Sequence, residues 1–92
     1  MQLPTISSYG KYESGNYGAH SLQVDFENFR LYYSYETIVA YYDITDGLVC
    51  CENVWRTTTG KHLNWIQPDK KSRMKFAKFD EMLKSMLERR TK

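Results

Sequence analysis

Residues that usually build metal and redox sites are scarce in this chain, which has two histidines, His20 and His62, and two cysteines, Cys50 and Cys51. The cysteines are adjacent, so on a strand they would point to opposite faces, and a disulfide between them is not expected. They also lack the C-x-x-C spacing of a zinc site, and cysteines within a strand are usually small core residues. We therefore expect no metal, no cofactor and no catalytic thiol.

Basic residues near the start and long apolar runs are also missing. Residues 1–6 contain neither lysine nor arginine, and no stretch approaches the roughly 20 apolar residues that a membrane helix needs. These absences favour a protein without a signal peptide or a membrane segment, in a reducing cytoplasm.

A chain of 92 residues is long enough for a single domain, residues 1–92, with one small core. Residues 1–19 are rich in Ser, Gly, Tyr and Asn, so we expect an arm there, with room for one short strand near residues 5–12. Four runs between residues 20 and 56 have the alternating, or β-branched and aromatic, pattern of strands: 22–26, 29–33, 37–42 and 48–55. The turns between them are too short for crossover helices, which predicts a four-stranded, mostly antiparallel meander.

The pattern changes after Trp55. Residues 57–68 predict a short helix over about Gly60–Ile66 and a loop, with Thr58 or Thr59 capping the helix.

A long C-terminal helix is predicted over residues 72–90, with Ser72 or Asp69 as the residue that caps its N-terminus. Its apolar side chains recur on one face, which we expect to pack on the sheet: Phe76, Phe79, Leu83, Met86 and Leu87. The fold class is therefore α+β, with a short helix and a long amphipathic C-terminal helix packed on one face of the sheet.

Charge is divided along the chain. Residues 1–55 carry seven acids and two bases, whereas residues 56–92 carry eleven bases and four acids. Either the basic helix neutralises the acidic sheet within the fold, or a basic face meets a phosphate backbone or an acidic protein. For nucleic acid, the candidate contacts are Lys70, Lys71, Arg73, Lys75 and Lys78, with Tyr32 or one of Tyr41 and Tyr42 as a stacking platform.

Residues 57–66 carry the densest set of chemically capable side chains, but they match no catalytic signature. A phosphate-binding loop would need a glycine where Trp55 stands and a serine or threonine where His62 follows Lys61. A single phosphate or carboxylate held at the helix N-terminus beside Lys61 remains compatible with the sequence. We therefore expect a binding protein rather than an enzyme.

Three segments together resemble a small uncharacterised domain family found in bacteriophages, plasmids and related bacterial elements. They are residues 15–22, residues 31–40, and residues 57–66 followed by Asp69-Lys70. The resemblance implies a mobile-element origin, a location in the cytoplasm of a bacterial host cell, and no catalytic residues.

Small proteins of such elements often bind a host factor, so we expect the partner to be a host protein, with inhibition of a defence nuclease complex such as CRISPR as the most concrete version. The contact would use the tyrosine-rich arm and the segment Gly60–Trp65. The candidate partner-binding residues are Tyr17, His20, Thr58, Thr59, Lys61, His62, Asn64 and Trp65. A nucleic-acid-binding accessory protein is the alternative, and the oligomeric state is left open.

Overall fold

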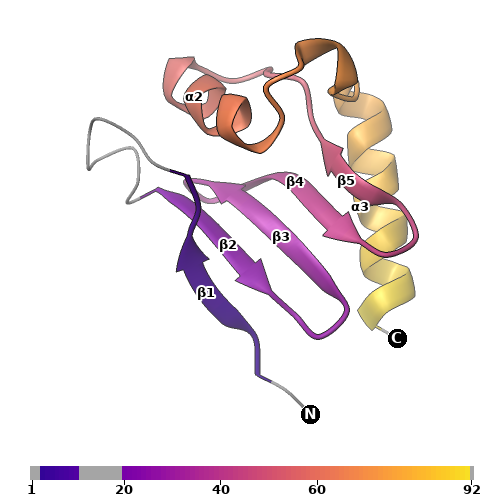
Figure 1. Cartoon of the computed structure of the whole chain (residues 1–92). Coiled ribbons are helices and arrows are strands. Elements are labelled where there is room, and N and C mark those ends of the chain that lie inside the picture. The colour runs from indigo at the N-terminus through magenta and orange to yellow at the C-terminus, as the bar shows by residue number, and fades with distance from the viewer. Residues whose placement is uncertain (1–2, 11–19, 92) are drawn as a thin grey trace.

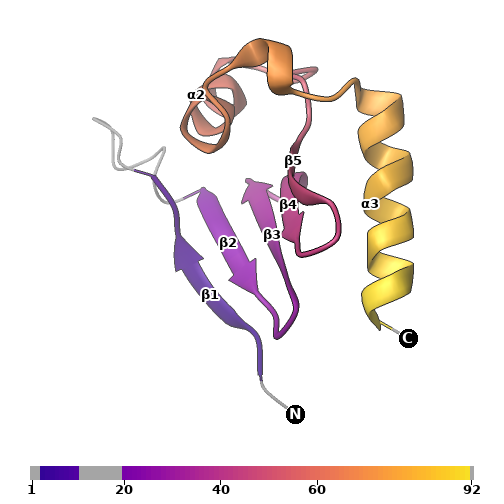
Figure 2. The ribbon, with the colours of Figure 1, turned by 45° about the vertical axis from the view of Figure 1, so that its right-hand side comes forward.

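One antiparallel sheet organises the computed structural model of the chain, which describes residues 3–10 and 20–91. Its strands lie side by side in chain order: β1 (Thr5–Ser8), β2 (Ser21–Asp25), β3 (Phe29–Ser34), β4 (Thr37–Asp43) and β5 (Gly47–Cys50). They are followed by α2 (Thr57–Ile66), the 3₁₀ helix η1 (Lys70–Ser72) and α3 (Phe76–Thr91). Figures 1 and 2 show α3 standing along the β4–β5 side of the sheet and α2 lying over the end at which β3 finishes. The α+β meander and the long C-terminal helix are confirmed.

The sheet has five strands, so the prediction of four was wrong. The additional strand is β1, which pairs with β2 so that Ile6 lies opposite Val24 and Ser7 opposite Gln23. All four residues of β1 are exposed. Their side chains therefore carry no alternation between buried and exposed positions, and backbone hydrogen bonds to β2 define the strand.

The face of the sheet toward α3 carries the larger apolar cluster. Leu31, Tyr41 and Val49 lie in one cross-strand row, and α3 covers this face with Phe79 and Met86, which are 2% and 0% exposed. Of the predicted helix stripe, Leu83 and Leu87 also pack here, and Phe76 lies edge-on to Trp55. The apolar stripe of the C-terminal helix therefore packs on the sheet as expected.

A β-bulge redirects side chains in β4. The register shifts between Tyr32 and Tyr33, so that Tyr32 lies opposite Ala40 while Tyr33 lies opposite Ile38, and Val39 is the extra residue. As a result Val39 and Ala40 both join a second cluster on the opposite face. There Leu63 of α2 packs on Val39, Ala40 and Cys50.

The adjacent cysteines contribute to opposite faces, as their spacing predicts. Cys50 belongs to the cluster under α2 and Cys51 to the cluster under α3, and both are buried free thiols. Burial raises the pKa of Cys50 to about 11 and that of Cys51 to about 12. Both therefore remain protonated at neutral pH, which makes them weak nucleophiles.

Both helices begin at residues other than those predicted. Neither Thr58 nor Thr59 caps α2, which begins at Thr57 after Arg56 without a side-chain capping bond. The helix start predicted at Gly60 was therefore three residues too late.

The C-terminal helix begins at Phe76 because its capping group comes from a distant residue. Glu52 accepts a hydrogen bond from the Phe76 amide at 2.9 Å and pairs with Lys75 at 3.4 Å. Asp69 instead accepts hydrogen bonds from the Lys71 amide and from Ser72 Oγ, and so caps η1.

A buried carboxylate fastens the other end of α3 to the sheet. Asp43, at the end of β4, is 0% exposed and accepts hydrogen bonds from Arg89 Nη2 at 2.8 Å and Arg90 Nε at 3.2 Å. The Asp46 amide donates to the same carboxylate at 2.7 Å. Although burial by itself raises the pKa of Asp43, the Asp46 amide and the two guanidinium groups lower it below its usual value. Acids of the sheet and bases of the helix therefore neutralise each other at this point.

Replacing Asp43 by asparagine keeps the shape of the side chain and removes its charge. We expect the free energy of unfolding at neutral pH to fall by about 2 kcal/mol, since a hydrogen bond to a charged group contributes about 1.5–3 kcal/mol. Because folding lowers this pKa, the stabilisation is present above the unfolded value of about 3.9 and is lost as the pH falls through the folded value. Urea unfolding should therefore show the gap between wild type and Asp43→Asn narrowing below about pH 4. A gap that stays constant in acid would contradict this role.

Candidate functional site

The residues predicted to bind a partner divide between the two sides of α2. Lys61, Asn64 and Trp65 point outward, and Trp65 is 53% exposed. Thr59 and His62 are buried against the sheet, and Thr58 is half-buried. The exposed three can contact a partner, whereas the buried two belong to the support of the helix.

That support is a polar network at the end of β3. Ser34 Oγ lies 2.9 Å from Thr59 Oγ1 and 2.7 Å from His62 Nδ1. Ser34 is 2% and His62 0% exposed, so solvent does not reach either side chain of this serine–histidine pair. The network joins the inner side of α2 to the end of β3 and leaves the outer side of the helix exposed.

The turn between β3 and β4 places an aromatic ring beside the start of α2. Tyr35 has φ 58°, a left-handed conformation that costs a non-glycine residue about 1–3 kcal/mol. Its ring stacks on His20 with 4.3 Å between ring centroids, and it is 42% exposed. A hollow of about 630 Å³ lies beside it, lined by Tyr35, Val54, Trp55, Arg56, Thr58 and Thr59. The predicted site residue His20 therefore packs against one face of the Tyr35 ring.

The tyrosine-rich arm is described only in part. Tyr9 is 5% exposed, and its hydroxyl donates a hydrogen bond to the Tyr33 carbonyl at 2.8 Å. This ring therefore packs back on the sheet. Tyr17, the remaining predicted contact, lies outside the described residues.

The first of the residues predicted to bind nucleic acid, in and after η1, lie next to the end of α2, which carries predicted protein contacts. Arg73 donates hydrogen bonds to Asn64 Oδ1 at 2.8 Å and to the Gln67 carbonyl at 3.0 Å, which ties the end of η1 to the end of α2. Lys70 and Lys71 of η1 are exposed. Part of each set, α2 with Lys61, Asn64 and Trp65 and η1 with Lys70 and Lys71, thus lies at one end of the molecule, where Figure 2 shows α2 and the segment that follows it.

The cations at this end differ from the other basic residues in whether they form ion pairs. Cations elsewhere face acids in the pairs Arg30–Asp25, Lys75–Glu52, Lys78–Glu81, Lys84–Asp80, Arg89–Asp43 and Arg90–Asp43. Within residues 3–10 and 20–91, Arg56, Lys70 and Lys71 make no ion pair. Cations that make no ion pair therefore lie before the first residue and beyond the last residue of α2, where Asp69 is the neighbouring acid.

We define the α2 surface by these exposed or half-exposed residues: Tyr35, Arg56, Thr58, Lys61, Asn64, Trp65, Lys70 and Lys71. It combines an exposed tryptophan, a tyrosine held by its turn, polar groups and cations.

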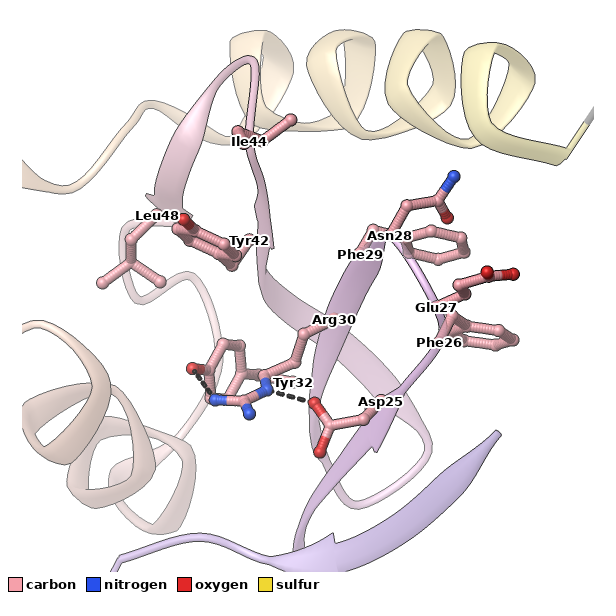
Figure 3. A pocket seen from close by; sticks show the side chains of 10 residues that line it. All are labelled: Asp25, Phe26, Glu27, Asn28, Phe29, Arg30, Tyr32, Tyr42, Ile44 and Leu48. Carbon is pink, nitrogen blue, oxygen red and sulfur yellow. Dashed lines mark hydrogen bonds and ion pairs between the residues drawn. The ribbon is translucent and has the colours of Figure 1, made fainter. Parts of the chain in front are cut away.

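A second concave surface, which the sequence did not predict, lies on the sheet face opposite α3. One row of cross-strand neighbours runs across this surface and consists of Asp25, Arg30, Tyr42 and Leu48. Arg30 contacts Asp25 and donates to the Tyr32 hydroxyl at 3.3 Å, so its guanidinium lies between the two, as Figure 3 shows. The hollow has a volume of about 640 Å³, and residues of the β2–β3 and β4–β5 turns, including Phe26 and Ile44, complete its lining.

Within the described part of the chain, no group of three or more His, Cys, Asp or Glu residues is arranged to hold a metal ion. Among the helices of that part, none is long and apolar enough to cross a membrane.

These features define a small α+β protein with a basic, tryptophan-bearing end and an uncovered sheet face. The chain belongs to a family of unknown function, DUF8033, whose model matches residues 2–81. Comparison with curated proteins and with solved structures found no match.

The polar network under α2 predicts a local loss of stability when Ser34 is replaced by alanine. Thr59 and His62 would each lose a buried hydrogen-bond partner, and we expect the free energy of unfolding to fall by about 1–3 kcal/mol. Hydrogen exchange of the α2 amides should accelerate. Ser7→Ala, at an exposed position of β1, is the control and should change stability by less than about 0.5 kcal/mol. Equal effects of the two substitutions would contradict the role of the network.

Proposed function

We propose that this protein is a non-enzymatic binding protein that contacts another protein through the α2 surface. The observation that carries the proposal is the exposed Trp65, which stands on a helix fixed from beneath by Ser34 and His62. Tryptophan and arginine are enriched among residues that dominate binding energy at protein interfaces. The hydrogen bonds beneath α2 also favour binding, because a surface that is already ordered loses little conformational entropy when a partner binds.

The character of the partner surface follows from charge. Arg56, Lys70 and Lys71 leave positive charge at both ends of α2, so an acidic protein surface would complement it and accelerate association. We place that surface on a protein of a bacterial host, with the chain as an accessory protein of a bacteriophage or plasmid in the host cytoplasm. Inhibition of a defence nuclease complex is the concrete form of this proposal.

Nucleic-acid binding is the second candidate, and the exposed Lys70 and Lys71 favour it. Single strands need cations that follow the backbone together with aromatic platforms for the bases. Lys75 and Lys78, which were predicted to continue the basic track, face Glu52 and Glu81. Of the predicted stacking residues, Tyr41 is buried, and Tyr32 is half-buried with the Arg30 guanidinium over its ring. Tyr42 is exposed, but it lies on β4 opposite Arg30 and not on α2 or η1. These arrangements support a protein partner over a nucleic acid.

Removing the exposed indole tests the main proposal. Trp65→Ala should leave the fold intact, because the side chain is half exposed, and should weaken binding of the partner about tenfold or more. The measurement is affinity capture from a bacterial cell extract with quantitative mass spectrometry, comparing wild type, Trp65→Ala and the control Ile6→Ala. Ile6 is also exposed, at 65%, but lies on β1. An unchanged list of captured proteins for Trp65→Ala would exclude this surface as the contact.

The two candidates differ in their response to salt. If the protein partner is correct, fluorescence anisotropy of a labelled single strand should show no binding that survives near-physiological salt. If nucleic acid is the ligand, binding should persist there, weaken steeply with added salt, and disappear in Lys70→Glu/Lys71→Glu. Lys78→Glu/Lys84→Glu is the matched control, since these two lysines already face acids on α3.

A further inference from the structure

The sheet face opposite α3 exposes more apolar surface than a solvated face needs. Three large apolar side chains that line the 640 Å³ hollow are exposed: Tyr42 at 48%, Ile44 at 82% and Leu48 at 42%. Antiparallel sheets can leave one face in water, but that face is then ordinarily polar. Here α2 packs on Val39, Ala40 and Cys50 at one end of the face, and the Tyr42–Leu48 end lies beyond it.

The same patch contains both a projection and a hollow. Ile44, on the β4–β5 turn, is the most exposed of the three apolar side chains. Figure 3 shows it at the margin of the lining, with Tyr42 and Leu48 on the adjoining strands. A projection beside a hollow is the arrangement that lets a surface fit its own copy about a two-fold axis, because each partner supplies both parts.

Charges in the patch are also of both signs. Arg30 lies within it, paired with Asp25, and the exposed Glu27 lies on the adjacent β2–β3 turn. In a two-fold arrangement Arg30, the basic group of the lining, can face Glu27 of the other copy while it keeps its contact with Asp25 of its own chain, so the patch can complement itself.

We propose that the open sheet face is the interface of a homodimer. Ile44 of each copy enters the hollow of the other and contacts Tyr42 and Leu48, while Arg30 of each copy faces Glu27 of the other. The hollow is lined by the β2–β3 and β4–β5 turns, and α2 lies over the opposite end of the sheet (Figure 1). Dimer formation therefore leaves both α2 surfaces free, and this inference does not depend on the proposed function.

Sedimentation velocity over a range of protein concentrations tests the dimer. The wild type should approach twice the mass of one chain, 10.9 kDa, as concentration rises. Ile44→Asp places a carboxylate in the proposed hollow and should raise the dissociation constant about 100-fold or more, since an unpaired charge buried at an interface is strongly unfavourable. Because Ile44 is 82% exposed, the variant should keep its fold, which circular dichroism will verify.

The control is Ile6→Asp, which introduces the same charge at an exposed isoleucine of β1. It should dimerise like the wild type. A wild type that keeps the mass of one chain at every concentration would overturn the proposal. Loss of the dimer in Ile6→Asp but not in Ile44→Asp would overturn it as well, because the interface would then lie at β1.

Discussion

One helix on each face is too little cover for a five-stranded sheet. A helix with its side chains is about 10 Å across and strands are spaced about 4.8 Å apart, so one helix covers about two strands. The sixteen residues of α3 close the central apolar cluster on one face, whereas the ten residues of α2 reach only one end of the other. The exposed row on β2–β5 and the exposed outer side of α2 both follow from this shortage of cover.

Polar contacts between residues far apart in sequence determine where the two helices lie. The Asp43 carboxylate holds the end of α3, the Glu52 carboxylate caps its start, and the Ser34 hydroxyl meets His62 under α2. Apolar packing alone tolerates sliding of a helix along a sheet, because it is not directional. Charged and hydroxyl groups have directional requirements, and here they fix the position of both helices.

These contacts also explain which parts of the fold the sequence could predict. Four strands were correctly expected because their side chains repeat with a period of two or are β-branched and aromatic, and the stripe of α3 was expected from its helical period. A short strand near residues 5–12 was allowed for, but it was not counted in the sheet, because β1 buries no side chain and so shows no alternating pattern. The start of α2 was misplaced because the helix begins at Thr57 without the side-chain cap that was expected. The start of α3 was misplaced because Glu52, which accepts from the Phe76 amide, is 24 residues away.

The candidate site was predictable to a smaller extent. The sequence singled out residues 57–66 as chemically dense, and Lys61, Asn64 and Trp65 are exposed there. Which of these ten residues face inward depends on how α2 lies against the sheet, and no local pattern encodes that. The open sheet face was missed for a related reason. Its row joins Asp25, Arg30, Tyr42 and Leu48 from four strands, and only the register brings them together.

The capping of α3 by Glu52 has a consequence for the order of folding. Each strand pairs with its neighbour in the chain, so the sheet can grow by successive hairpins as the polypeptide leaves the ribosome. The final helix can dock only after Glu52 and Asp43 are in place. Until then Leu31, Tyr41 and Val49 remain in contact with water. A chain interrupted before α3 would therefore expose the apolar face of its sheet, and docking of the sixteen residues of α3 ends the period in which that face can drive aggregation.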